Sequence, residues 1–166
     1  MSKIITRKPL SKQLYQMEIK PSGTFVNPQP GQYFILRKKP NGTGISLPVI
    51  KSDPSRETLT LIAESLPGEL AALRNPCSSG NEVELEGPFG QAFQIEKFGP
   101  VICACDGDGL LALYPALKAL HQAKNQVSII LSGIEEIEPI IETEIRSLCD
   151  ELILTGAAPG RKTAYQ

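Results

Sequence analysis

The stretch VICACDGDGLLALYPALKAL, from Val101 to Leu120, decides the fold of the second half of the chain. Its first five residues are an apolar run with β-branched side chains, long enough for one buried strand. The tetrapeptide Asp106-Gly107-Asp108-Gly109 ends that run, and leucines then recur at helical spacing. A strand, a glycine turn and a helix in this order aim a helix N-terminus at a phosphate. Two aspartates at the turn would repel that phosphate, so a tight turn without a ligand is an equally good interpretation.

The composition excludes several classes of protein. Of the 166 residues, 41% are hydrophobic and 21% charged, which is typical of a globular domain. Lys and Arg number 17 against 18 Asp and Glu, so no electrostatic footprint for nucleic acid exists. No apolar run approaches the roughly 20 residues that span a bilayer. The N-terminus MSKIITRKPL lacks the pattern of a signal peptide, and we expect a cytoplasmic protein.

The residues that could bind a metal are few and poorly spaced. The chain has four cysteines and the single histidine His121. Cys103 and Cys105 are separated by one residue, so a strand places both on one face, but this spacing matches no common zinc or iron–sulfur pattern. We expect buried thiols that act as small apolar side chains, a solvated His121 near a helix end, and no metal site.

Residues 1–97 are predicted to be rich in β-strand. Alternating apolar and polar residues, as in residues 58–63 and 82–86, indicate half-buried strands. Segments rich in Gly, Pro, Asn and Ser separate them. A short helix is expected over residues 69–74. Six short strands with such turns favour a closed antiparallel barrel. The predicted strands cover residues 4–5, 14–19, 32–37, 47–50, 58–63 and 83–86.

Residues 98–166 change to a helical period between short strands. The pattern predicts strands over 101–105, 127–131 and 151–155, with helices over 109–124 and 135–149. This βαβαβ order is typical of a parallel sheet with right-handed crossovers. The chain is therefore expected to form two domains that divide near Phe98.

Several short segments, in this order, resemble the ferredoxin–NADP⁺ reductase superfamily. They are Pro30-Gly31-Gln32-Tyr33-Phe34, Gly87-Pro88-Phe89-Gly90, Phe98-Gly99-Pro100-Val101, Leu113-Tyr114-Pro115 and Gly160-Arg161-Lys162. They are similar in particular to the branch of dihydroorotate dehydrogenase electron-transfer subunits and of NADH-dependent ferredoxin:NADP⁺ oxidoreductases. The resemblance implies a six-stranded antiparallel FAD-binding-type barrel over 1–97, followed by a shortened parallel βαβαβ nucleotide-binding-type domain over 98–166.

The resemblance also implies which residues would contact FAD: Tyr33, Ser46, Leu47, Pro48, Val49, Gly68 and Ala71. In the family, an arginine at the position of Ser46 pairs with the FAD diphosphate, and a hydroxyl residue at the position of Val49 reaches flavin N5. Serine lacks the bidentate fork of a guanidinium. At the expected helix start Gly68 is kept, whereas the hydroxyl is replaced by Ala71 and a carboxylate is added. Lys51 and Arg56 are the nearest cations in the sequence.

The nucleotide turn departs from the family run GGGxGxAP in a similar way. Gly107 and Gly109 remain as doubtful nucleotide contacts, while Cys105 and Asp106 replace the glycines that let the backbone approach a diphosphate. Relatives continue with a further helix and strand for nicotinamide, then with a cysteine cluster for [2Fe–2S]. Neither segment is in this sequence. We expect weak or no NAD(P)H binding and no iron–sulfur cluster.

These losses favour a degenerate ferredoxin-reductase-like subunit without catalytic residues, which has a structural or regulatory role in a redox complex. An FAD-binding electron-transfer subunit of an oxidoreductase complex is the alternative, and a free-standing NAD(P)H reductase is the least favoured. We expect a protein partner in a redox complex or a homodimer, because three strands cannot cover all the apolar helix residues. Those residues are Leu110, Leu111, Leu113, Leu117, Ile140 and Ile141.

Overall fold

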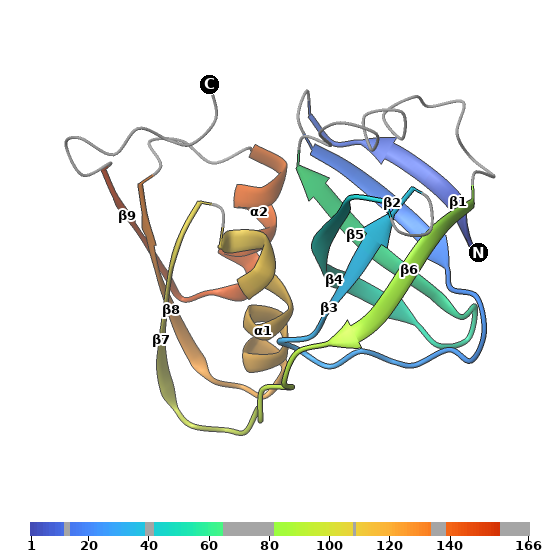
Figure 1. The fold of residues 1–166 in the computed structure, drawn as a ribbon. Helices are drawn as coiled ribbons and strands as arrows, with labels where there is room; N and C mark the ends of the chain where they lie inside the picture. The colour runs from blue at the N-terminus through green and yellow to red at the C-terminus, as the bar shows by residue number, and fades with distance from the viewer. Residues whose placement is uncertain (12–13, 39–41, 65–81, 108, 134–138, 157–166) are drawn as a thin grey trace. The chain divides into compact units, whose positions relative to one another are not determined.

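The computed structural model describes residues 1–11, 14–38, 42–64, 82–107, 109–133 and 139–156. The chain divides into two compact units, Met1–Phe93 and Gln94–Gln166, both drawn in Figure 1. This division follows Phe93, a few residues before the boundary that the sequence predicts near Phe98. The helix expected over residues 69–74 lies outside the described residues.

The first unit is a closed six-stranded barrel with the strand order β1-β2-β5-β4-β3-β6. Every neighbouring pair is antiparallel, and β1 pairs with β6 to close the barrel. The predicted antiparallel barrel is therefore confirmed. Its strands are β1 (Ser2–Pro9), β2 (Leu14–Lys20), β3 (Tyr33–Arg37), β4 (Gly44–Asp53), β5 (Thr58–Glu64) and β6 (Glu82–Phe89).

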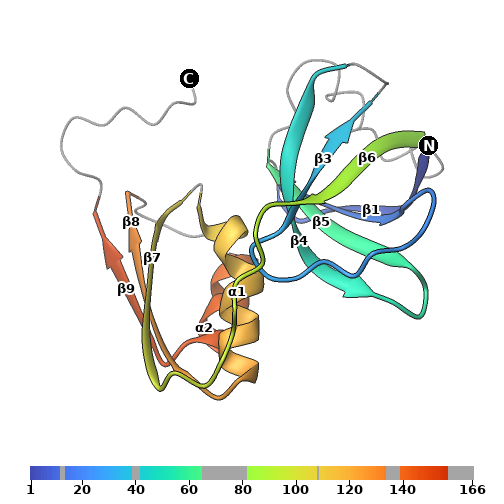
Figure 2. The same cartoon turned by 60° about the horizontal axis from the view of Figure 1, so that its bottom comes forward.

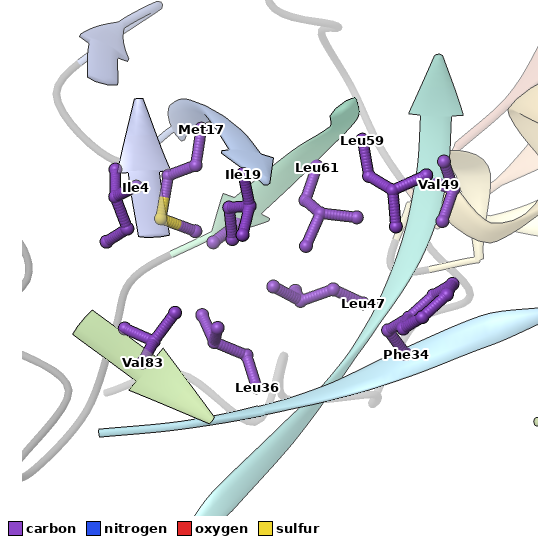
Figure 3. Packing of buried hydrophobic residues seen from close by; sticks show 11 residues of the cluster. Ile4, Met17, Ile19, Phe34, Leu36, Leu47, Val49, Leu59, Leu61 and Val83 are labelled. Atoms are coloured by element: carbon purple, nitrogen blue, oxygen red, sulfur yellow. The ribbon is translucent and has the colours of Figure 1, made fainter. Parts of the chain in front are cut away.

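Alternation along the strands fills the barrel with apolar side chains. Leu36, Leu59 and Leu61 are fully buried, and Figure 3 shows them pointing into the same interior as Ile4 and Val83. A side chain of this kind contributes roughly 1.5–3 kcal/mol when it is fully buried. On each strand the intervening residues point outward, and this alternation determines which side chains a ligand outside the barrel can reach.

The two glycine motifs at the end of the barrel lie against each other. Gly31 has a φ of +91°, and a Cβ there would lie 2.9 Å from the carbonyl oxygen of Gln91. A Cβ at Gly90 would lie 3.1 Å from the carbonyl oxygen of Gly31. The amide of Phe93 donates to the carbonyl of Pro30 at 2.9 Å. The glycines are therefore needed for close backbone approach where β3 begins and β6 ends.

The second unit is a parallel three-stranded sheet in the order β7-β8-β9. Figures 1 and 2 agree that α1 and α2 lie on the same face of this sheet. Neither described helix is long and apolar enough to cross a membrane. The predicted βαβαβ order is confirmed, with β7 (Pro100–Asp106), α1 (Leu110–Gln122), β8 (Gln126–Ser132), α2 (Pro139–Leu148) and β9 (Glu151–Thr155).

The helix leucines are more deeply buried against the sheet than the sequence predicts. Leu110 and Leu117 are buried against Val127, Ile129 and Leu131. Of the other helix residues expected to remain uncovered, Leu113 and Ile141 are half-buried in the same core, Leu111 is half-buried, and the side chain of Ile140 lies outside the described part of the chain. The expectation of uncovered apolar helix faces is therefore wrong for Leu110 and Leu117.

Several exposed apolar residues of the second unit lie on the opposite side of the sheet. Ala104, Ile130 and Ile153 form one row across the three strands, and Ile102 lies beside it on β7. We call these four residues the bare sheet face. The side chain of Ile102 is 71% exposed and that of Ile153 is 39% exposed.

The buried side chain of Asn125 fixes the start of the second unit. Its Oδ1 accepts hydrogen bonds from the amides of Phe98, at 2.6 Å, and Gly99, at 3.1 Å. Its Nδ2 donates to the carbonyls of Glu96, at 2.9 Å, and Leu120, at 3.0 Å. The side chain of Asn125 thus forms hydrogen bonds with four backbone groups, three from the residues just before β7 and one from the last turn of α1.

Candidate functional site

The first candidate site is the outer face of three adjacent barrel strands, β4-β3-β6. On β3 the inward residues Phe34 and Leu36 are buried, so Tyr33, Ile35 and Arg37 point outward. The register pairs Tyr33 with Pro48, Ile35 with Ser46 and Arg37 with Gly44 on β4. On the other side β3 pairs with Phe89, Glu86 and Glu84 of β6. We call these outward residues the outer face.

One end of the outer face is aromatic. The rings of Tyr33 and Phe89 have centroids 6.0 Å apart with a 39° angle between their planes. The two residues are 36% and 40% exposed, and the nearby Phe93 is 54% exposed. A soluble domain seldom leaves several neighbouring aromatic side chains in water without a use, and a planar ring system is a natural ligand for such a surface.

The residues that the family resemblance assigned to FAD fall into three groups. Tyr33, Ser46 and Pro48 lie together on the outer face. Leu47 and Val49 are each 7% exposed and their side chains belong to the barrel core, so only their backbones are available to a ligand outside. The remaining assigned residues, Gly68 and Ala71, lie outside the part of the chain that the structure describes.

Sequence reasoning missed a cation that lies on this same face. Arg37 is directly opposite Gly44, and its stem crosses that glycine. A Cβ at Gly44 would lie 3.1 Å from Cγ of Arg37 and 2.7 Å from Cγ2 of Ile35. The Nη1 atom of Arg37 donates to Oε2 of Glu86 at 2.5 Å. The signal was present, because Arg37 is four residues after Tyr33 and a strand places both on one face.

The two cations named from the sequence lie elsewhere. Arg56 binds Oε1 of Glu18 through Nη1 at 2.9 Å. Lys51 is exposed and follows a register irregularity in β4, where the strand pairs with Thr60 of β5.

The second candidate site is the nucleotide turn between β7 and α1. Oδ1 of Asp106 accepts a hydrogen bond from the amide of Gly109 at 2.9 Å, and Gly109 is the residue that precedes α1. The amide of Leu110 donates to the carbonyl of Gly107 at 3.3 Å. A carboxylate of the chain itself therefore lies where a phosphate would meet the helix N-terminus. Asp108 lies outside the described residues.

The thiols near this turn are protonated at neutral pH. Burial raises the pKa of Cys103, and burial with the charges of Asp106 and Cys103 raises the pKa of Cys105 to about 11. Burial also raises the pKa of Cys149. Among the described residues, no group of three or more His, Cys, Asp or Glu side chains could hold a metal ion. The thiols thus have the character of apolar side chains and not of nucleophiles.

Comparisons with known proteins agree with this fold. No protein-family model matches the chain. A dihydroorotate dehydrogenase B (NAD⁺) electron transfer subunit homolog from Thermotoga maritima is 23% identical over 155 residues, which cover 93% of this chain and 55% of the relative. The chain therefore spans about half the length of this curated relative.

Two solved structures extend the comparison. The structure of NADH-dependent reduced ferredoxin–NADP oxidoreductase, studied for flavin-based electron bifurcation, superposes with a TM-score of 0.75 and 22% identity, over 96% of this chain and 59% of the other. Flavohemoglobin from Malassezia yamatoensis, with bound FAD and heme, superposes with a TM-score of 0.68 and 15% identity, over 92% of this chain and 43% of the other.

The barrel thus has the architecture of an FAD-binding reductase barrel. The parallel sheet with its two helices has that of a shortened nucleotide-binding domain. Within that class, the resemblance to the ferredoxin–NADP⁺ reductase superfamily is confirmed, and the sequence relative lies in the dihydroorotate dehydrogenase electron-transfer branch.

Proposed function

We propose that this chain is an FAD-binding subunit of a redox complex, and that its nucleotide turn does not bind NAD(P)H. The flavin ring lies against the aromatic end of the outer face. A protein partner supplies the electron donor or acceptor. The relative from Thermotoga maritima, an electron transfer subunit homolog, supports the assignment to a complex.

The observation that carries this proposal is the exposed ring pair of Tyr33 and Phe89 beside Pro48. An isoalloxazine ring that covers these side chains would remove their apolar surface from water, which is favourable in proportion to the area covered. The fold supports the same ligand, because the flavohemoglobin that superposes on this chain was solved with bound FAD.

The proposal that the nucleotide turn does not bind NAD(P)H depends on Asp106. Its carboxylate already accepts the Gly109 amide, so an incoming diphosphate would have to displace a negative charge and a hydrogen bond. Repulsion between the Asp106 carboxylate and the diphosphate, screened by solvent, costs about 1 kcal/mol.

A second candidate function is a structural or regulatory subunit that binds neither cofactor. The replacement of the family arginine by Ser46 favours it, as does the inward-pointing Val49 in place of a hydroxyl residue. In that case the complex would use the barrel as a scaffold, and its redox chemistry would take place entirely on the partner.

Purification of the full chain from its native source distinguishes the two functions. A flavin subunit is yellow, releases FAD on acid treatment, and binds added FAD with a measurable change in flavin fluorescence. Added NADH should leave the bound flavin oxidised unless the partner is present. Colourless protein that fails to bind added FAD would favour the scaffold, and rapid reduction by NADH alone would contradict the proposal that the nucleotide turn does not bind NAD(P)H.

A further inference from the structure

We propose that Arg37 binds the diphosphate of FAD on the outer face, in place of the cation missing at Ser46. This inference rests on the proposed function, in which the barrel holds FAD. It concerns one residue of β3 whose side chain is in an ion pair with Glu86.

The position of Arg37 matches the length of an extended dinucleotide. Tyr33 marks the aromatic end of the outer face, and Arg37 is four residues further along β3, which corresponds to about 13 Å. Ile35 and its partner Ser46 lie between them. A ligand with its ring on Tyr33 and its chain along β3 and β4 therefore brings its phosphates to the pair formed by Arg37 and Gly44.

The surroundings of Arg37 suit a phosphate contact. Gly44 has no side chain, and a Cβ there would lie 3.2 Å from Nε of Arg37, so an added side chain would crowd the guanidinium. The Arg37 side chain is 23% exposed. A guanidinium has five N–H donors, and the pair with Glu86 uses one nitrogen. The fork can therefore stay anchored to Glu86 and still donate to a phosphate oxygen.

The two cations named from the sequence are less suitable. Lys51 lies beyond Pro48, at the opposite end of β4 from Gly44, and carries a flexible, strongly hydrated ammonium group. Arg56 is already paired with Glu18. Neither lies beside Arg37 on the β3–β4 pair.

Two carboxylates oppose the proposed contact and define its limits. Glu84 and Glu86 of β6 flank Arg37 and Ile35 on the side of β3 that is away from β4. A diphosphate would therefore lie over β4, at Gly44 and Ser46, where the described strands place no carboxylate. Glu86 positions the guanidinium but also repels the ligand, so its charge should lower FAD affinity.

The test compares FAD with riboflavin, which has the same ring and no phosphate, on the full chain. We expect Arg37→Gln to weaken FAD binding at least tenfold, as for the loss of a charged hydrogen bond, and to leave riboflavin binding within about twofold. Lys51→Gln removes one positive charge from the neighbouring strand β4, where it pairs with β5, and is the matched control. It should change FAD affinity by less than about twofold, because exposed charges are screened.

Two conservative variants refine the assignment. Arg37→Lys should restore only part of the FAD affinity, since an ammonium lacks the fork. Glu86→Gln should tighten FAD binding several-fold, because it removes a repelling charge and frees the guanidinium.

Each outcome decides a separate question. Wild-type protein that binds neither flavin overturns both the proposed function and this inference. If the wild type binds FAD and Arg37→Gln binds it equally well, only the inference is wrong. If Arg37→Gln loses FAD and riboflavin together, Arg37 has a structural role and the inference is again overturned. Loss of FAD alone supports it.

Discussion

The outer face of the barrel carries a cation, Arg37, which is paired with Glu86, whereas the nucleotide turn of the second unit carries the carboxylate of Asp106. The residues that the family resemblance predicts to bind phosphate are replaced in both regions, at Ser46 in the first and at Cys105 and Asp106 in the second. The barrel supplies a cation from the neighbouring strand. The turn supplies a carboxylate that takes the helix amide for itself. In our proposal the two replacements therefore have opposite effects, because the cation at the first site attracts a diphosphate and the carboxylate at the second repels it.

The largest expected effect tests whether the two regions are energetically separate. Asn125→Ala would remove the side-chain hydrogen bonds to the part-buried amides of Phe98 and Gly99 and to the carbonyls of Glu96 and Leu120. Each lost hydrogen bond costs about 0.5–1.5 kcal/mol, and we expect about 3 kcal/mol of destabilisation in the second unit. Thermal unfolding followed by circular dichroism measures this loss, and FAD binding at the barrel should stay unchanged. A simultaneous loss of FAD binding would show that the barrel depends on the second unit.

The second prediction addresses the charge at the nucleotide turn. Asp106→Gly combined with Asp108→Val removes both negative charges, and each charge costs about 1 kcal/mol against an anion. We expect NAD(P)H affinity to rise at least fivefold in titration calorimetry. The turn should lose about 1 kcal/mol of stability, because Asp106 no longer accepts the Gly109 amide.

The matched control for this pair of substitutions is Asp106→Asn. It removes the charge of Asp106 and keeps a side-chain oxygen that can accept the Gly109 amide. Its affinity should fall between those of the wild type and the double variant. Equal affinity in all three proteins would mean that the charge is not what closes the turn.

The sequence predicted the elements of both regions and missed the contacts that give them their chemistry. Alternation in residues 58–63 and the helical period after Gly109 depend on neighbours in the chain, so the barrel and the βαβαβ order followed from them. Leu47 and Val49 were assigned to a ligand by their place in a motif, although strand alternation turns their side chains into the core. Arg37 lies opposite Gly44 through strand pairing, and Asn125 contacts Glu96 through tertiary folding, and no local sequence pattern reveals either contact.

The third prediction is a smaller effect, in which the charge of Asp106 changes the pKa of the nearby Cys105 thiol. Burial is the main reason that the pKa of Cys105 is raised to about 11, and the negative charge of Asp106 raises it further by disfavouring the thiolate. Asp106→Asn should therefore lower this pKa, so that alkylation of Cys105 by iodoacetamide becomes faster at mildly alkaline pH. Mass spectrometry of the alkylated peptide as a function of pH measures the shift. Cys103, whose pKa is raised by burial alone, is the internal control.

The smallest effect on stability is expected at the bare sheet face, and it contrasts the two sides of one sheet. Ile102 is 71% exposed on the side of the sheet opposite α1 and α2, whereas Ile129 is fully buried on the side that these two helices cover. Ile102→Ser should change the free energy of unfolding of the isolated chain by less than about 0.5 kcal/mol. Ile129→Ala should cost about 2–5 kcal/mol, because it leaves a cavity in the core. Urea unfolding of the two variants gives both values.

The same pair of variants tests whether the bare sheet face is free in solution. If copies of this chain associated through it, Ile102 would be buried there, and Ile102→Ser would cost a similar amount to a core substitution and lower the mass measured by light scattering. A neutral Ile102→Ser with unchanged mass shows that the face is solvated in the isolated protein. Any partner that covers it must then come from outside, as a subunit of a redox complex would. In that case the chain's own helices cover one side of the sheet, and a different protein would cover the other side.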